Sequence, residues 1–405
     1  MSVRPGVLRA AAIAAAVALT LAGCSGGDED TAAPAAPAAV AGSSIDLKAA
    51  GCPGTVVVQG GWFQTMDIGV PFQLLGDDYK VDAGRKRVSG SLVVDGKDTG
   101  VDIEFRAGGP AVGFQNGPAV AAQDPSITLV FANLDEIIAG WAKAPMRAVV
   151  APMNGDPQAI IYDPARHPDW NTIADIGQTD TKVLYSNNAR APFAYLVGSG
   201  ILRPGQVAAS YDGSPSQFVA AQGRIAVQGY ATNEVGVYES LPQWHKPVGY
   251  FLVQDSGYPN YAGVLAIRPA DEKRLAPCLK QLVPVFQQAQ IDMMADPGPA
   301  EQKIVRSVAD FRSIFQYSAQ NAQFGLCQIS KESLVSNPPT GPLGTMEPGK
   351  VRRVVDVLRP ILTAQKTEVP ADLTADKLAT NEYLDSSKRL PSAAPSWASS
   401  CPSRG

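Results

Sequence analysis

The fold is decided by a stretch in the middle of the chain, which reads TKVLYSNNARAPFAYLVGSG over residues 181–200 and VAASYDGSPSQFVAAQG over residues 207–223. In each half a short apolar run is followed by a polar turn and then by residues that suit a helix. We therefore predict strands over 182–185 and 207–211, each leading into a helix. Strands that alternate with helices are typical of mostly parallel sheets with helices on both faces, which indicates the α/β class.

The start of the second helix is marked by three residues. Ser214 is expected as the N-cap, Pro215 at the first helical position and Gln217 at the capping-box position. A similar signal occurs earlier in the chain, where Asn133 precedes a helix that has Glu136 three residues on.

The same pattern extends outward in both directions. Short apolar runs predict strands over 55–59, 127–131, 148–151, 225–230, 249–253 and 264–267. The segments 88–94 and 101–105, joined around the turn dipeptide Asp95-Gly96, are expected to form a hairpin. After residue 267 the chain becomes helical, with long helices expected over 301–317, 319–334 and 348–366.

The N-terminus has the features of an export signal. Arg4 and Arg9 precede an apolar core over 10–22, which is shorter than the roughly 20 residues that span a bilayer. The core ends in Leu21-Ala22-Gly23-Cys24, which predicts cleavage before Cys24 and lipid on that cysteine, palmitate included. The alternative is an ordinary signal peptide with a chance cysteine. The Ala-, Pro- and Gly-rich residues that follow, up to residue 50, are expected to be a flexible linker.

Composition narrows the class of protein. The chain has 405 residues, of which 45% are hydrophobic and 18% charged, as in a globular protein with real cores. The net charge of −4 and the lack of a basic block argue against a nucleic-acid partner.

Five cysteines are present, and lipidation would use Cys24. The other four lie in an oxidising compartment if the chain is exported, and four cysteines allow three pairings. We expect Cys278 to pair with Cys327 and Cys52 with Cys401; four free, buried thiols are the alternative.

No signature of catalysis is found in the sequence. The two histidines, His167 and His245, lie in polar, Pro-flanked segments that are typical of surface loops. No metal-binding or nucleophile-and-base motif accompanies them. We therefore expect a protein that is not an enzyme and that has no metal or cofactor.

Polar and aromatic residues follow several of the predicted strands. Ligands of open α/β sheets lie outside the carboxyl ends of the strands, where helix N-termini also present free N–H groups. Turn formation, capping or surface solvation could explain most of these residues individually. We predict a binding cleft formed by Trp62, Asp135, Ser186, Asn187, Asn188, Asp212, Gly213, Ser214, Tyr230, Asn233 and Glu234.

Four segments together resemble a known family, namely VDIEFRAGGP (101–110), TKVLY (181–185), SYDGSP (210–215) and LAPCLK (275–280). The chain resembles the extracytoplasmic solute-binding proteins of ABC transporters, in the branch that takes up nitrate, sulfonate, taurine and thiamine precursors, and in particular actinobacterial lipoproteins of that type. It departs from that branch at 186–188 and 233–235, where the family often has Phe-Glu-Gly and Ser-Glu-Pro.

The resemblance implies a two-lobed, type II periplasmic-binding-protein-like α/β fold whose lobes are joined by two crossover strands. The implied division is a signal peptide (1–23), a lipid-anchored linker (24–50), a discontinuous first lobe (51–152 and 256–390), a second lobe (153–255) and a C-terminal tail (391–405).

The implied function is capture of a small solute, an anion or a heteroaromatic molecule, and its delivery to ABC permease subunits by a lipid-anchored monomer at the outer face of the cell membrane. A solute-binding sensor or scaffold without a transporter is the alternative.

Overall fold

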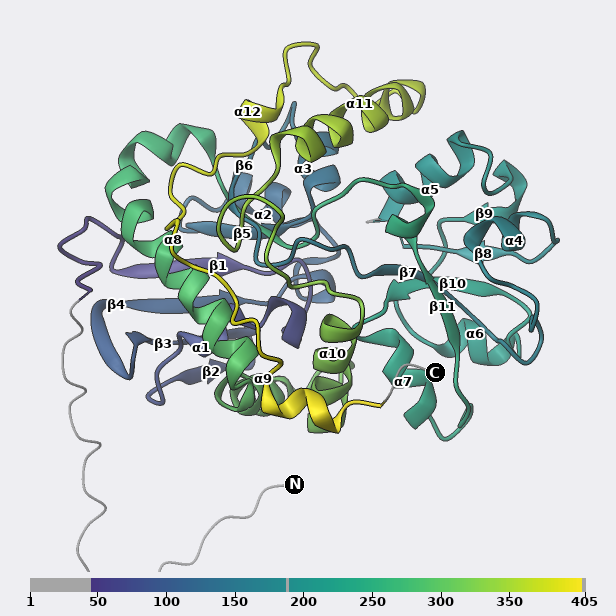
Figure 1. The fold of residues 1–405 in the computed structure, drawn as a ribbon, viewed down its shortest axis with the longest axis horizontal. Helices are drawn as coiled ribbons and strands as arrows, with labels where there is room; N and C mark the ends of the chain where they lie inside the picture. Colours follow the sequence, from purple (N-terminus) through teal and green to yellow (C-terminus); the bar gives the residue numbers. More distant parts are fainter. Residues whose placement is uncertain (1–44, 187–188, 403–405) are drawn as a thin grey trace, which may run out of the picture. The chain divides into compact units, whose positions relative to one another are not determined.

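The computed structural model describes residues 45–186 and 189–402, which form two β-sheets flanked by helices (Figure 1). The predicted signal peptide, Cys24, Asn187 and Asn188 lie outside the described residues. No helix in the described part of the chain is both long enough and apolar enough to cross a membrane.

The first sheet has seven strands in the order β2-β3-β4-β1-β5-β12-β6. Its centre is the buried run that the sequence marks as a strand, since β1 pairs in parallel with β4 on one side and β5 on the other. The hairpin expected around Asp95-Gly96 is confirmed as β3 and β4. The strands are β1 (Thr55–Gln59), β2 (Lys80–Asp82), β3 (Arg87–Val94), β4 (Lys97–Arg106), β5 (Leu129–Ala132), β6 (Arg147–Val150) and β12 (Val264–Ile267).

The second sheet has five strands in the order β11-β7-β10-β8-β9. They are β7 (Gln158–Tyr162), β8 (Val183–Leu184), β9 (Val207–Ala208), β10 (Ala226–Tyr230) and β11 (Gly249–Leu252). The chain enters this sheet after β6 and returns to the first sheet at β12, so the two sheets are connected twice. The prediction of a two-lobed α/β fold is confirmed.

The expectation of mostly parallel sheets is wrong in detail, because both sheets are mixed. Of the ten strand pairs in the described residues, four are parallel: β1 with β4 and β5, and β8 with β9 and β10. The remaining pairs are antiparallel. In the first sheet β3 runs opposite to β2 and β4, and β12 runs opposite to β5 and β6; in the second sheet β7 runs opposite to β10 and β11. The strand β7 was also not expected from the sequence, although all five of its residues are buried.

Helices cover the sheets and connect their strands. The helix α8 packs an apolar stripe that includes Leu275, Leu279, Leu282 and Phe286 into the core of the first sheet. The helices are α1 (Val70–Gln73), α2 (Gly117–Gln123), α3 (Leu134–Gly140), α4 (Ile173–Gly177), α5 (Arg190–Gly198), α6 (Ser216–Ala220), α7 (Glu234–Ser240), α8 (Glu272–Ala295), α9 (Gly298–Phe311), α10 (Ala319–Lys331), α11 (Pro348–Ala364) and α12 (Ala375–Leu378).

The folded chain begins earlier than the linker prediction allowed. Leu47 is fully buried, and its backbone N–H donates to the Thr99 carbonyl at 3.0 Å. Asp46 caps the turn that follows by accepting from the Ala49 N–H at 2.8 Å. Residues 45–50 therefore pack on the hydrophobic core between the first sheet and α8, which we call the first core. Two apolar side chains, Ile45 and Leu47, hold this short segment in place.

The two disulfides confirm that the four cysteines are oxidised but contradict the expected pairing. Cys52 is bonded to Cys278, and Cys327 is bonded to Cys401. The first bond joins the segment before β1 to α8, whereas the second joins the C-terminal segment to α10. The sequence could not show that α8 lies beside the first strand, nor that the chain end returns to α10.

The C-terminal segment is correspondingly ordered. Besides the disulfide at Cys401, the Trp397 indole N–H donates to the Met294 carbonyl at 2.8 Å, and its ring packs against the first core. The tail is thus fixed at two points.

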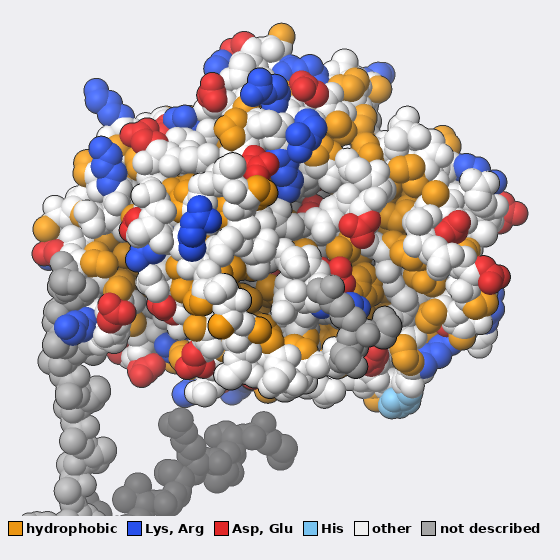
Figure 2. Space-filling view, viewed as in Figure 1, with side chains coloured by type: hydrophobic (Ala, Val, Ile, Leu, Met, Phe, Trp, Pro, Cys, Tyr) orange, Lys and Arg blue, Asp and Glu red, His pale blue; other side chains and the backbone are white. Residues whose placement is uncertain are grey.

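Figure 2 shows Lys and Arg side chains and Asp and Glu side chains scattered over the same face of the molecule. This face has no broad basic area, in agreement with the small net charge of the chain.

Candidate functional site

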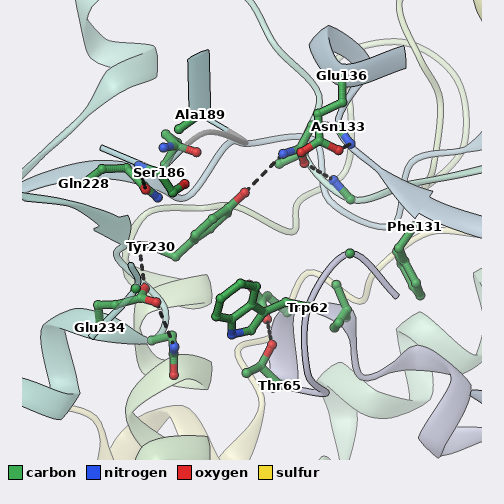
Figure 3. A pocket seen from close by; sticks show the side chains of 18 of the residues that line it. Trp62, Thr65, Phe131, Asn133, Glu136, Ser186, Ala189, Gln228, Tyr230 and Glu234 are labelled. Carbon is green, nitrogen blue, oxygen red and sulfur yellow. Dashed lines mark hydrogen bonds between the residues drawn. The ribbon is translucent and has the colours of Figure 1, made fainter. Parts of the chain in front are cut away.

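A cavity of about 340 Å³ lies between residues that follow the strands of both sheets. This volume falls in the range of small-molecule sites, which are mostly apolar with a few well-placed polar groups. The polar and charged side chains that line it are Thr65, Asp67, Asn133, Glu136, Gln158, Ser186, Asp212, Gln228, Asn233 and Glu234, and the aromatic ones are Trp62, Phe114, Phe131, Tyr211 and Tyr230 (Figure 3).

Trp62 is positioned by glycines on both sides of its ring. It follows β1, and a Cβ added to Gly109 would lie 2.4 Å from its Cε3 atom, so only glycine allows the ring to lie there. Gly109 also has a positive φ of 57°, which L side chains rarely adopt. On the other side, a Cβ on Gly213 would lie 3.3 Å from the Trp62 Cη2 atom. The GGP and DGSP motifs therefore meet at the Trp62 ring.

Asn133 and Glu136 reach the cavity from the start of α3, directly after β5. The Asn133 N–H donates to Glu136 Oε2 at 3.3 Å, and the two residues form the capping box that the sequence predicted. The other carboxyl oxygen of Glu136 has no hydrogen-bond donor among the described residues. This carboxyl group therefore both caps the helix and presents an acceptor to the cavity.

Tyr230 and Glu234 reach the cavity from the second sheet, at the end of β10 and the start of α7. The Tyr230 N–H donates to Glu234 Oε2 at 2.7 Å, and Asn233 Nδ2 donates to Glu234 Oε1 at 3.2 Å. Ser186 follows β8, and its N–H donates to Gln228 Oε1 at 3.3 Å. The ends of the neighbouring strands β10 and β8 thus supply one wall.

Two hydrogen bonds cross the cavity from one sheet's residues to the other's. Asn133 Nδ2 donates to the Tyr230 hydroxyl at 3.2 Å, and Figure 3 shows that hydroxyl directed at Asn133. Thr232 Oγ1 donates to Asp67 Oδ2 at 3.1 Å. Together with the proximity of Gly213 to the Trp62 ring, these bonds join the two walls of the cavity.

The electrostatics of the cavity are dominated by carboxyl groups. Burial, with the negative charge of Asp135 as a smaller cause, raises the pKa of Glu136 to about 8. Burial also raises the pKa of Asp67 and of Glu234 above the ordinary value, although hydrogen bonds to each carboxyl oppose the shift. Ionising any of these buried carboxyl groups costs free energy, because no positively charged side chain lines the described part of the cavity.

Seven of the predicted residues line the cavity, namely Trp62, Ser186, Asp212, Gly213, Tyr230, Asn233 and Glu234. Asp135 does not, because its side chain is buried behind α3, where it accepts from the Tyr258 hydroxyl at 2.7 Å. Burial raises the pKa of Asp135 to about 7.

Ser214 is also outside the lining, and it is not the N-cap of α6, which is Pro215. The Ser214 N–H instead donates to Asp212 Oδ1 at 2.9 Å, so these residues form a turn at the rim of the cavity.

Five further lining residues were not predicted from the sequence: Thr65 and Asp67, which lie in an irregular segment after Trp62, and Phe114, Gln158 and Gln228. Glu136 was recognised only as a capping residue. The only feature of the sequence that could have indicated these residues is their position at the end of a strand or a few residues after it.

The two histidines lie away from the cavity lining. His167 stacks on Trp170 with ring centroids 3.6 Å apart, and His245 is exposed. Within residues 45–186 and 189–402, no group of three or more His, Cys, Asp and Glu side chains is arranged to hold a metal ion.

No protein-family model matches the sequence, and no curated protein is similar to it in sequence. Solved structures are nevertheless similar in fold. The periplasmic aliphatic sulphonate binding protein SsuA of Escherichia coli is 15% identical and superposes with a TM-score of 0.53 over 85% of this chain and 97% of its own. A protein from Bordetella bronchiseptica is 13% identical, with a TM-score of 0.51 over 82% of this chain and 96% of its own. The fold is that of a periplasmic binding protein.

A third neighbour is the alkanesulfonate-binding protein SsuA of Xanthomonas axonopodis pv. citri bound to MOPS. It is 12% identical, with a TM-score of 0.50 over 81% of this chain and 98% of its own. At these identities the likeness concerns the fold, and the ligand of this chain has to be argued from its own cavity.

Proposed function

We propose that this protein binds a small solute outside the cell and delivers it to the permease of an ABC importer. The observation that carries the proposal is the cavity of about 340 Å³, which lies where the strand ends of two sheets meet in a periplasmic-binding-protein fold. Aromatic rings and hydrogen-bonding groups converge there from both sheets, as binding of a small molecule requires.

The two lobes would open and close about the segments that connect the sheets. We place the first lobe at 45–152 and 256–402 and the second at 153–255. The connections touch each other, because Asn260 Nδ2 donates to Asp156 Oδ2 at 2.9 Å. The bonds from Asn133 to Tyr230 and from Thr232 to Asp67 would then hold the closed state, and opening would break them.

Solute binding can be tested by screening a library of small molecules for their effect on thermal unfolding. The protein used is the chain without its predicted signal peptide. Sulfonates, nitrate, pyrimidines, vitamins and amines are added one at a time, and we expect a subset to raise the melting temperature, since a ligand of the native state stabilises it. If no compound of any class raises it, the proposal of solute binding fails. If a solute binds but its uptake is unchanged in cells that lack the protein, a sensor role replaces transport.

We further propose that lipid on Cys24 anchors the protein at the outer face of the membrane, as the LAGC pattern at 21–24 indicates. About 20 residues would then link the lipid to the folded chain, whose first described residue is Ile45. Such a linker spans roughly 25 Å if it behaves as a random coil, which keeps the binding site near the membrane.

Replacing Cys24 with serine is expected to release the protein. The variant should appear in the medium or in the soluble extracytoplasmic fraction, whereas the wild type stays with the membrane fraction, because a single cysteine holds the anchor. Solute affinity should be unchanged. Immunoblots of the two fractions make the comparison, and a variant that stays with the membrane would contradict the anchor.

A further inference from the structure

The cavity contains four carboxyl side chains, on Asp67, Glu136, Asp212 and Glu234. No Lys, Arg or His is present among the described residues that line it. The carboxyls come from both sheets, since Asp67 and Glu136 follow strands of the first and Asp212 and Glu234 follow strands of the second. A bound solute would thus meet carboxyl groups on several sides.

The N-terminus of α3, which lies at the cavity, is not free to bind an anion. At the start of α3, the Asn133 N–H is taken by Glu136 and the Glu136 N–H by Asp135, while the Asp135 N–H donates to Asn260 Oδ1 at 3.3 Å. At α3 the chain's own acceptors therefore occupy the donors that an anionic solute would need. In the second sheet, Glu234 accepts from the Tyr230 N–H, so a carboxyl group faces this part of the cavity.

Aromatic rings and a further acceptor face the same space. Trp62 and Phe114 form one pair, with ring centroids 6.1 Å apart, and Tyr230 lies on the other wall. Asn233 is more than nine-tenths buried, and its Oδ1 has no hydrogen-bond donor among the described residues. Ring faces attract cations, and an acceptor without a donor favours a ligand that carries N–H groups.

We propose that the solute is a small organic cation with a planar part, held between the aromatic rings and the carboxylates of the cavity. The inference rests on the proposed function and adds the chemical class of its ligand. A bare metal ion fits less well, since the carboxyls are spread over the walls and no described cluster has the geometry of a metal site. An anion such as a sulfonate would meet four carboxyl groups without a cationic partner in the described lining.

Two probe series test the charge of the solute at nearly constant shape. The first is benzamidine, benzamide and benzoate, and the second is tryptamine, indole-3-acetamide and indole-3-acetate, each measured by thermal unfolding and titration calorimetry. We expect the cation of each series to bind at least about tenfold more tightly than its amide, and the carboxylate not to bind. An amide or carboxylate that binds as tightly as the cation overturns the inference, while the proposed function survives.

If no compound of either series binds, the charge of the tightest-binding solute from the library screen tests the inference instead. If its tightest solute is a cation, the inference is supported, and if that solute is an anion or is neutral, the inference is wrong. If the library also gives no binder, the proposed function fails with it.

Charge-neutralising variants locate the effect. Glu136→Gln keeps the size and the acceptor for the Asn133 N–H, whereas Glu234→Gln keeps the acceptor for the Tyr230 N–H and loses the bond from Asn233 Nδ2. Each variant should weaken the bound cation about tenfold or more while sparing the amide. Glu239→Gln is the matched control, because Glu239 is an exposed residue on the same helix as Glu234. Melting temperatures without solute report folding, and equal affinities of the Glu136 and Glu239 variants for the cation would contradict the assignment.

Proton release provides a second readout. The titratable groups facing Glu136 are Asp135, Asp156, Tyr230 and Tyr258, and the charge of Lys350 acts on Asp156. Since burial raises the pKa of Glu136 to about 8, most of this group is protonated at neutral pH, and a bound cation favours the ionised form.

Affinity for the cation should therefore rise as the pH increases from 6 towards 8, the range below the raised pKa of Glu136. Calorimetry in two buffers of different ionisation enthalpy should show protons released on binding. Uptake of protons, or the same pH profile in Glu136→Gln, would overturn the inference.

Discussion

Replacing Trp62 with alanine is expected to weaken solute binding about 10- to 100-fold. The ring lies in the middle of the cavity lining, between Gly109 and Gly213, and no smaller side chain can contact both loops. Loss of this buried surface removes about 1.5–3 kcal/mol of packing energy from the complex. Titration calorimetry of the tightest solute from the screen measures the change.

Two controls distinguish lost contact from lost structure. Trp141→Ala removes a half-buried tryptophan that packs against the buried cluster containing Ile137 and Leu358 and lies outside the cavity lining, so it should leave the affinity near that of the wild type. Trp62→Phe keeps an aromatic ring but should abolish solute-dependent quenching of tryptophan fluorescence, since the four other tryptophans lie outside the lining. Full affinity in Trp62→Ala would contradict the account of the site.

Removing the bond between Cys52 and Cys278 by replacing both with alanine should lower the free energy of unfolding by about 2–5 kcal/mol. The bond joins residues 226 positions apart, and it fixes the segment before β1 to α8 within the first core. Both cysteines are buried, so the variant also loses packing. Urea unfolding followed by circular dichroism measures the difference.

The second disulfide offers a matched comparison. Cys327 and Cys401 are 74 positions apart, so the shorter loop predicts a loss that is smaller by about 1 kcal/mol when both are replaced with alanine. That variant should also free the segment around Trp397, which limited proteolysis would detect. A stability unchanged by the first double substitution, or a larger loss from the second, would show that the core around Cys52 does not depend on this bond.

Several strands could be predicted from the sequence because short runs of neighbouring residues are enough to indicate them. The run at 55–59 is short, apolar and β-branched, and Asp95-Gly96 is a turn dipeptide between alternating segments, so β1 and the hairpin of β3 and β4 follow directly. In contrast, β7 is preceded by Gly155, Asp156 and Pro157, which read as a loop, and the direction of strand pairing depends on how the chain crosses between the sheets.

The disulfide pairing could not be predicted, because it depends on which distant segments pack together. Cys52 and Cys278 meet only because α8 covers the first sheet, and Cys401 meets Cys327 only because the chain end returns along Met294. Proximity along the sequence, which favoured a bond between Cys278 and Cys327, was therefore misleading.

The site was partly predictable for the same reason as the fold. Strand ends meet at one edge of a sheet, so Trp62, Ser186, Tyr230 and Glu234 were found by position alone. The choice between Asp135 and Glu136 required the rotation of α3, which turns Asp135 towards Tyr258 and leaves Glu136 on the cavity wall. Asp67 lies in an irregular segment, where the sequence gives no periodicity to show which side chains face a ligand.

The most direct test of the account is a crystal structure of the protein grown with the tightest solute from the screen. The account predicts that the solute occupies the cavity, with its planar part against the Trp62 ring and a positively charged nitrogen within hydrogen-bond distance of the Glu136 or Glu234 carboxyl group. A solute bound elsewhere on the protein, or one held in the cavity by an anionic group, would contradict it.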